Sequence, residues 1–288
     1  MKEKRFDFFA APPDGKREEE IRSYLLSAHA PLFSTEIGKS ICGRPLHLFR
    51  VGKGARALLL VGAHHGMEWI TALLLYRFLD DLLVAISRRG EGAILSGDVS
   101  LYVLPLFNPD GVEIALKGAR WQANARGVDL NHNYDAGFDA YREKERELGI
   151  LGPAPTRYSG PYPFSEPETA AMRALLAELS PSLVLTLHTQ GEEIFYKPTD
   201  PPVSGAERIG YLLSLMTGYR LGTATGAAAY GGLSDYVAEK LRRPAFTLEC
   251  GLGKNPLPIG AGEGIYRRLR RALFYALLMT KEDFVWNA

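Results

Sequence analysis

The sequence predicts an α/β fold, built as a single domain with one mixed, mostly parallel sheet and helices on both faces. Short apolar runs alternate with amphipathic helical stretches along the chain, which is typical of an α/β protein. The runs at 57–62, 183–187 and 245–248 are almost continuously apolar, as expected for strands that are buried on both faces. The 288 residues contain no repeat, low-complexity tract or linker, so we expect one domain over 1–288.

Each further element has its own local signal. Residues 16–28 are expected to form a helix with Ile21, Tyr24, Leu25 and Ala28 on one apolar face. The Ser-Glu-Pro-Glu stretch at 165–168 is typical of a capping box that opens a helix to about residue 179. Residues 108–111 form a turn, and the polar, glycine-containing stretch 118–160 is expected to be mostly loop. The other expected helices are 68–86, 206–215, 232–241 and 263–279, and the other expected strands are 47–51 and 100–104.

The composition excludes several classes of function. The formal net charge is +1, so there is no electrostatic basis for binding nucleic acid or an anionic membrane. No stretch approaches the roughly 20 apolar residues of a membrane helix, and the first residues lack the apolar core of roughly 7–15 residues that a secretion signal needs. We therefore expect a cytoplasmic protein. Cys42 and Cys250 are too few for a cysteine zinc site, and the sequence leaves their pairing and the oligomeric state open.

Reactive side chains follow three of the predicted strands. His65 and Glu68 come after the run 57–62, His188 follows 183–187, and Glu249 follows 245–248. In α/β sheets, ligands and chemistry gather outside the carboxyl ends of the strands, so we expect these four side chains to meet. Two imidazoles and one carboxylate are the ligand set of a catalytic zinc ion. Glu249 is then the free acid that serves as general base.

Each part of this pattern has a structural alternative when it is taken alone. The His65-x-x-Glu68 pair also fits an ordinary polar start of a helix. His64 has His-x-x-x-Glu spacing to Glu68 and competes for the ligand role. His188 alone fits a core histidine with satisfied hydrogen bonds, whereas an acid such as Glu249 after a buried strand is costly unless it is paired or functional. Only the four residues together favour a metal site.

The chain resembles the zinc carboxypeptidase superfamily, carboxypeptidase A-like. The resemblance rests on five stretches in the family's order and spacing: 62–69 (GAHHGMEW), 108–111 (NPDG), 127–131 (GVDLN), 188–190 (HTQ) and 247–249 (TLE). A narrower resemblance, to the bacterial branch that contains γ-D-glutamyl-L-diamino acid endopeptidases, rests on 126–131, 165–169 and 187–192.

The resemblance implies a role for each of the central residues. His65, Glu68 and His188 would bind one Zn²⁺ ion. Glu249 would activate the attacking water and later protonate the leaving amine. The family also places an arginine upstream of the Asp-x-Asn motif to stabilise the oxyanion. Arg120 and Arg126 both qualify, and Arg126 is preferred because it lies closer to that motif.

The substrate-binding residues include one departure from the family. Asn131 matches the asparagine that helps to hold the terminal carboxylate of the substrate. The next position is an arginine in exopeptidases of the family, and here it is His132, which would grip a carboxylate more weakly. This departure favours a substrate with a different end, such as a diamino acid.

Three further residues are expected at the substrate site. Gln190 lies in the HTQ stretch. Tyr230 abuts a glycine pair, whereas the family's mobile tyrosine aligns near Ala227, so Tyr230 either covers the site or packs beside it. Asp235 corresponds to the specificity-pocket region and would meet the ammonium group of a diamino acid, although an aspartate in a first helical turn has a structural reason of its own.

The predicted function is zinc-dependent hydrolysis of an amide bond in a small peptide, by attack of an activated water. The narrower expectation is a cell-wall peptide that contains D-glutamate and a diamino acid. An ordinary metallocarboxypeptidase, an aspartoacylase-type deacylase and a zinc-binding module without catalysis are the alternatives.

Overall fold

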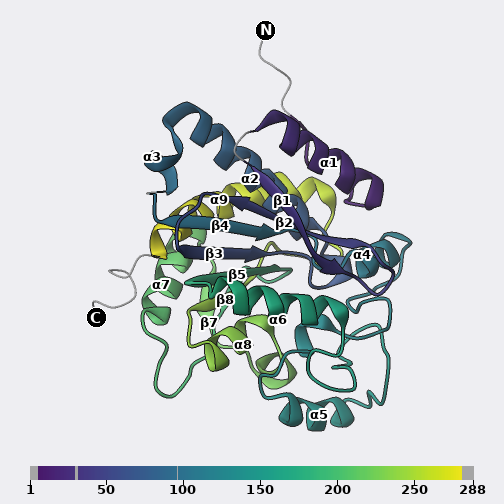
Figure 1. The fold of residues 1–288 in the computed structure, drawn as a ribbon. Helices are drawn as coiled ribbons and strands as arrows, with labels where there is room; N and C mark the ends of the chain where they lie inside the picture. Colours follow the sequence, from purple (N-terminus) through teal and green to yellow (C-terminus); the bar gives the residue numbers. More distant parts are fainter. Residues whose placement is uncertain (1–5, 30–31, 96, 281–288) are drawn as a thin grey trace.

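A computed structural model describes residues 6–29, 32–95 and 97–280, and these residues build one eight-stranded sheet (Figure 1). The strand order is β1-β2-β4-β3-β5-β8-β6-β7. The strands are β1 Phe33–Lys39, β2 Pro45–Val51, β3 Arg56–Val61, β4 Val99–Leu104, β5 Leu183–His188, β6 Glu193–Phe195, β7 Arg220–Gly222 and β8 Ala245–Glu249. The α-helices are α1 Gly15–Ala28, α2 Ile70–Arg89, α3 Glu91–Leu95, α4 Pro109–Leu116, α5 Phe138–Glu147, α6 Pro167–Leu179, α7 Ala206–Thr217, α8 Leu233–Lys240 and α9 Gly262–Met279.

The centre of the sheet is parallel and its flanks are mixed. Strands β4, β3, β5 and β8 run parallel to one another. Strand β2 joins β4 antiparallel on one side, and β6 joins β8 antiparallel on the other. The predicted mixed, mostly parallel sheet is confirmed, and the three almost continuously apolar runs form three of its four central strands.

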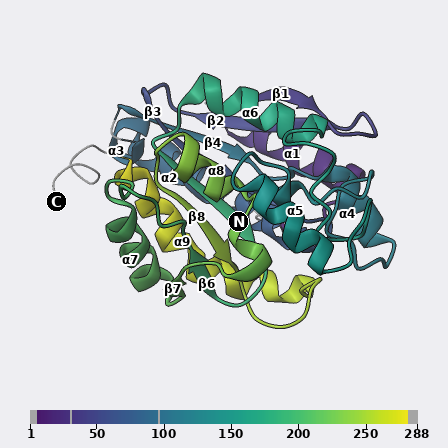
Figure 2. The same cartoon turned by 90° about the horizontal axis from the view of Figure 1, so that it is seen from below.

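Helices cover both faces of the sheet, as predicted. Successive residues of β3 point to opposite faces, so Leu58 and Leu60 pack in a core with α2, α7 and α9, whereas Leu59 and Val61 pack in a second core with α6 and α8. Figures 1 and 2 show α2 and α9 on one side of the sheet and α6 and α8 on the other.

Several elements differ from the sequence-based expectation. Helix α5 lies inside the stretch that was expected to be mostly loop, and the turn at 108–111 runs directly into α4. The predicted capping box at α6 is wrong. The N-cap residue is Glu166, which makes no side-chain cap bond, and Ser165 Oγ donates to the Glu166 carboxylate. Residues 1–5 and 281–288 of the predicted domain lie outside the described residues.

A close contact between two glycines fixes the turn that follows β3. This turn contains the short 3₁₀ helix η1, Gly66–Glu68, which lies against α4. A Cβ on Gly66 would come 2.2 Å from the carbonyl oxygen of Gly111, so neither backbone could approach as closely with a side chain present. The predicted site residues on this turn are therefore held by backbone packing.

The structure also bears on membrane crossing and on the state of the two cysteines. Among the described helices, none combines the length and the apolar character that a membrane crossing requires. Cys42 is exposed, Cys250 is buried, and both are free thiols.

Candidate metal centre

The carboxyl ends of β3, β5 and β8 bring the predicted reactive residues together. His188 is the last residue of β5 and stands beside Glu249, the last residue of β8, in the parallel register. The turn after β3 carries His65 and Glu68 to the same edge. Its path is fixed by Thr71 Oγ1, which accepts from the Ala63 backbone N–H at 2.8 Å.

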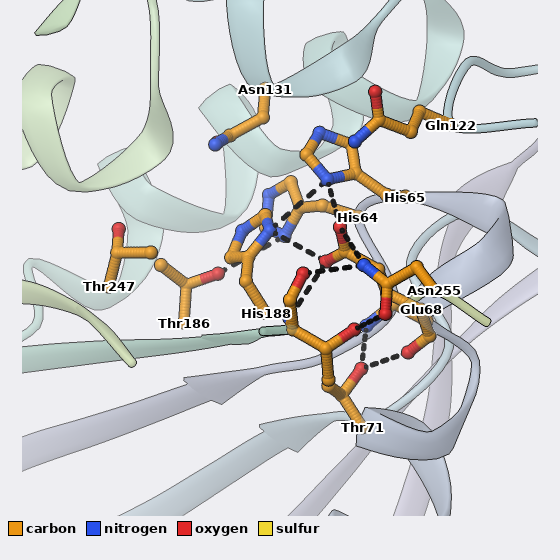
Figure 3. Close-up of polar contacts among 12 residues, drawn as sticks. His64, His65, Glu68, Thr71, Gln122, Asn131, Thr186, His188, Thr247 and Asn255 are labelled. Atoms are coloured by element: carbon orange, nitrogen blue, oxygen red, sulfur yellow. Dashed lines mark hydrogen bonds and ion pairs between the residues drawn. The ribbon is translucent and has the colours of Figure 1, made fainter. Parts of the chain in front are cut away.

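His65, Glu68 and His188 offer one ligand atom each within 4.8 Å of one another (Figure 3). Nδ1 of His65 lies 2.9 Å from Glu68 Oε1, and Nδ1 of His188 lies 3.1 Å from Glu68 Oε2. The two Nδ1 atoms are 3.3 Å apart. Two nitrogens that each lie about 2.0–2.1 Å from one tetrahedral zinc ion are separated by about 3.3 Å, so this donor set fits Zn²⁺.

The electrostatics of these three residues also suit a cation. Burial alone would raise the pKa of Glu68, but the His65 and His188 imidazoles overcome that effect and lower the pKa to about 2. Burial would lower the pKa of His65, but Glu68 and Asp129 raise it well above its ordinary value. Glu68 is therefore ionised, and the site stabilises positive charge at the place where the three ligand atoms meet.

Two further side chains and one backbone N–H group hold these three residues in position. Asp129 Oδ1 lies 3.1 Å from His65 Nε2, the ring nitrogen that faces away from the ligand cluster. Asn255 Nδ2 lies 3.5 Å from Glu68 Oε1 and donates to the Thr189 carbonyl at 2.7 Å. The backbone N–H of Thr189 donates to Glu68 Oε2 at 3.1 Å. Partners of this kind orient metal ligands and fix the histidine tautomer.

His64 does not compete for the ligand role. Its Nε2 lies 3.3 Å from the Tyr134 hydroxyl, and its Nδ1 lies 3.2 Å from Thr186 Oγ1, so both ring nitrogens have other partners. Burial, reinforced by the neighbouring His188, lowers the pKa of His64 well below its ordinary value. It is a neutral core residue beneath the site.

Glu249 lines the same cleft as His65 and His188, without being one of the clustered ligands. Burial, and secondly the Glu68 carboxylate, raise the pKa of Glu249 well above its ordinary value. A carboxyl group in this environment can accept and return a proton, which is what a general base near a metal must do.

The cleft has a volume of about 200 Å³ and includes three of the predicted substrate-binding residues, Asn131, His132 and Asp235. His132 stacks on Tyr141 with ring centroids 4.0 Å apart, and its Nδ1–H donates to the Tyr230 carbonyl at 2.8 Å. Burial lowers the pKa of His132, so the imidazole is neutral near pH 7. Burial also raises the pKa of Asp235, to about 6.

Four other predicted residues are not brought into the cleft. Arg126 pairs with Glu166 at 3.3 Å, and its side chain is 52% exposed. Arg120 and Gln190 are exposed and do not line the cleft. The Tyr230 ring packs beside Gly137 and under Lys197 and is not among the residues that line the cleft, whereas its carbonyl oxygen accepts from His132. Arg126 was preferred because it lies closer in sequence to the Asp-x-Asn motif, but in the folded chain its side chain does not line the cleft.

Gln122 and Arg157 line the cleft, and sequence reasoning did not select them. Gln122 lies in the predicted loop, where no pattern marks it. Arg157 has a positive φ of 65°, and its backbone N–H donates to Asp129 Oδ2 at 2.9 Å. Asp129 lies in the GVDLN stretch at 127–131, but its spacing from His65 in the sequence does not indicate that the two side chains are in contact. A larger groove of about 770 Å³ between β1 and α6 holds none of the predicted site residues.

The chain is similar to known proteins in sequence and in structure. Residues 25–267 match the family model described as zinc carboxypeptidase. The γ-D-glutamyl-L-diamino acid endopeptidase 1 of Lysinibacillus sphaericus is 31% identical over 271 residues, which cover 84% of this chain and 66% of that protein. Murein peptide amidase A of Escherichia coli (strain K12) is 32% identical over 162 residues, which cover 52% of this chain and 57% of that protein.

Among solved structures, the carboxypeptidase A from Helicoverpa armigera has a TM-score of 0.75 at 20% identity, with 96% of this chain and 75% of that chain covered. This likeness shows the fold. The family match extends over most of the sequence, so the chain belongs to the zinc carboxypeptidase family. It is a zinc metallopeptidase that uses one Zn²⁺, as the three convergent ligands also indicate.

Proposed function

We propose that this peptidase cleaves the amide bond between D-glutamate and a diamino acid in cell-wall peptides. The observation that carries this proposal is that one cationic side chain, Arg157, and one acidic side chain, Asp235, both line the cleft that also contains His65 and His188. A diamino acid residue presents both a carboxylate and an ammonium group, which are the partners of these two side chains. The names of the two bacterial relatives point to the same substrate class.

The carboxylate end of the substrate lies, in this proposal, near Asn131 and Arg157. Asn131 Oδ1 accepts from the Leu233 backbone N–H at 3.2 Å, which leaves its amide N–H₂ available to the cleft. Arg157 lines the cleft together with Asn131 and His132, and its positive charge adds to burial in lowering the pKa of His132. Since His132 is neutral, Arg157 takes the place of the arginine that exopeptidases of the family carry at position 132.

The proposed reaction divides the work among few residues. When bound by His65, Glu68 and His188, Zn²⁺ supplies a lowered water pKa and a Lewis acid for the scissile carbonyl. Glu249 takes a proton from the attacking water and returns it to the nitrogen of the leaving amine. Asp129 keeps the His65 ring oriented while the charge at the site changes.

The test compares two substrates on the zinc-loaded protein. We expect L-alanyl-γ-D-glutamyl-diaminopimelate to be cleaved with a kcat/KM at least about 100-fold above that of an acyl-dipeptide with a free C-terminus, because the cleft recognises both charges of the diamino acid. Mass spectrometry of the products identifies the bond that is cut. A preference for the acyl-dipeptide would contradict the proposal and favour an ordinary metallocarboxypeptidase.

One alternative function and the predicted location have tests of their own. Turnover of N-acetyl-aspartate in place of peptides would support the aspartoacylase-type deacylase. The predicted cytoplasmic location stays a prediction, and finding the active protein in the culture medium would contradict it.

A further inference from the structure

Gln122 is fixed by its backbone beside the turn that carries two metal ligands. Its carbonyl oxygen accepts from the Gly66 N–H at 3.0 Å and from Asn108 Nδ2 at 3.1 Å, and its own N–H donates to the Pro155 carbonyl at 2.9 Å. Gly66 directly follows the ligand His65 in η1. Any movement of the Gln122 backbone would therefore also disturb the metal centre.

The side-chain amide of Gln122 is oriented by a hydroxyl. Thr156 Oγ1 donates to Gln122 Oε1, so the amide oxygen is occupied and the N–H₂ group is left to face elsewhere. In Figure 3 the amide nitrogen points toward the His65 ring and the oxygen points away from it. Both residues line the cleft. The cleft thus contains a neutral N–H donor of fixed direction at the side of the metal ligands.

The two arginines that the sequence suggested, Arg120 and Arg126, do not line the cleft and cannot serve as this donor. Arg126 is bound to Glu166 outside the cleft. Among the described cleft-lining residues the one guanidinium is that of Arg157, which is exposed and whose charge is felt at His132. Arg157 is accordingly assigned to the carboxylate of the substrate, and the scissile carbonyl needs another partner.

We propose that the Gln122 amide donates a hydrogen bond to the scissile carbonyl oxygen and stabilises the negative charge that develops there, in place of a cationic side chain. No bond to Gln122 forms or breaks: its N–H is polarised, and Thr156 keeps it aimed while the carbonyl carbon becomes tetrahedral. A preorganised donor acts mainly on the transition state, so its loss appears in kcat. The inference rests on the proposed peptidase function of this cleft.

The experiment replaces Gln122 by Met, which has a similar length, carries no charge and has no N–H donor. We expect kcat for the glutamyl-diaminopimelate peptide to fall by about 10²–10³-fold, which is the effect of removing one oxyanion donor. We expect KM and the zinc dissociation constant to stay within about threefold, because neither depends on this hydrogen bond. A phosphonate analogue of the peptide should bind weaker by the same factor as kcat/KM falls.

Two matched variants distinguish this role from a structural one. Gln122→Arg, which restores a donor at the same place, should bring kcat back to within about tenfold of the unmodified protein. Arg146→Ala removes an exposed guanidinium of α5, outside the cleft, and should leave kcat unchanged. A kcat of Gln122→Met within about threefold of the unmodified protein, or a kcat loss that follows loss of zinc, would overturn the inference.

Failure of this inference and failure of the proposed function give different results. If the unmodified protein cleaves no glutamyl-diaminopimelate peptide, the proposed function fails. If it cleaves the peptide and Arg157→Ala, rather than Gln122→Met, lowers kcat without raising KM, only the inference about Gln122 fails, and the guanidinium is the group at the carbonyl.

Discussion

Asp129 connects the metal centre to the substrate side of the cleft through its two carboxylate oxygens. Oδ1 faces His65 Nε2, and Oδ2 accepts from the backbone N–H of Arg157. Burial would raise the pKa of Asp129, but His65 and its other partners hold it well below its ordinary range, so the group stays ionised. One side chain thereby sets both the orientation of a metal ligand and the position of the guanidinium-bearing loop.

Replacing Asp129 by Asn should weaken zinc binding. The substitution keeps the shape but removes the charge that favours the His65 Nε2–H donor and raises the basicity of the ring, so we expect the zinc affinity to fall by about 10–100-fold. Competition with a chelator measures the dissociation constant. Asp139→Asn, on the exposed start of α5, is the control, and equal affinities for the two variants would contradict the role given to Asp129.

Replacing Glu249 by Gln should separate metal binding from turnover. Glu249 is not one of the three clustered ligands, so we expect one zinc ion per chain to be retained. Without the carboxylate no residue accepts the proton of the attacking water, and kcat should fall by about 10²–10⁴-fold. Zinc content by elemental analysis and initial rates provide the two measurements. Near-normal turnover with a full complement of zinc would exclude Glu249 as the base.

The sequence was sufficient for the residues that sit at strand ends and insufficient for those placed by loops. His65, Glu68, His188 and Glu249 each follow a recognisable apolar strand, so their convergence was predictable. Gln122 was not, because its position depends on hydrogen bonds of a loop to η1 and to Asn108 that leave no periodic pattern.

At the scale of the elements, the register of two parallel strands places the proposed general base beside a proposed metal ligand. β5 and β8 are neighbours, and their last residues, His188 and Glu249, are paired across the strands. A slip of one residue would turn one of these side chains to the opposite face of the sheet. The metal centre therefore depends on the same strand pairing that builds the core.

Helix α6 should contribute a pH dependence to stability through Glu168. Burial raises the pKa of this carboxyl, in the first turn of α6, from 4.5 to about 7. The folded state thus holds the proton more tightly than the unfolded chain. The stability associated with the neutral carboxyl is present below pH 4.5 and is lost as the pH rises towards 7, by about 3 kcal/mol at most.

The variant Glu168→Gln tests this prediction. Gln keeps an oxygen that can accept the Ile41 N–H, which Glu168 Oε1 accepts at 3.2 Å, and it carries no titrating proton. We expect the variant to match the unmodified protein near pH 4.5 and to be more stable at pH 8, in urea unfolding at both values. Equal stability of the two proteins at pH 8 would show that Glu168 ionises in the folded state without cost.

The elements that sequence patterns missed are short, charged or mostly exposed, and they include the edge strand β1, none of whose residues is fully buried. β6 and β7 have three residues each, which is too short for an alternation to be recognised. Helix α5 (FDAYREKERE) buries only Phe138, Tyr141 and Glu145, so its apolar face is two aromatic residues wide and its charges resemble those of a loop. Long strands and helices that carry a continuous apolar face were predicted correctly, because their pattern extends over enough residues to be recognised.

At the scale of the whole molecule, zinc should stabilise the fold. The ligands come from the turn after β3 and from the end of β5, which are more than 100 residues apart in the sequence, so the unfolded chain offers no preformed site. At a free zinc concentration of 100 times the dissociation constant, binding adds about 2.7 kcal/mol. For a chain of this size we expect the melting temperature to rise by about 5 °C.

Thermal denaturation with and without a chelator measures this shift. Glu68→Gln, which removes one ligand charge, should melt at a temperature that no longer depends on zinc. An equal zinc effect in this variant and in the unmodified protein would place the stabilising ion elsewhere.

The central claim is that one zinc ion is bound by Nδ1 of His65, the carboxylate of Glu68 and Nδ1 of His188. The most direct measurement is a crystal structure of the zinc-loaded protein with anomalous diffraction recorded on both sides of the zinc absorption edge. We predict one strong anomalous peak per chain, at about 2.0–2.2 Å from these three atoms and with Glu249 outside the coordination sphere. A peak bound by other residues, or none at this cluster in fully loaded crystals, would contradict the account.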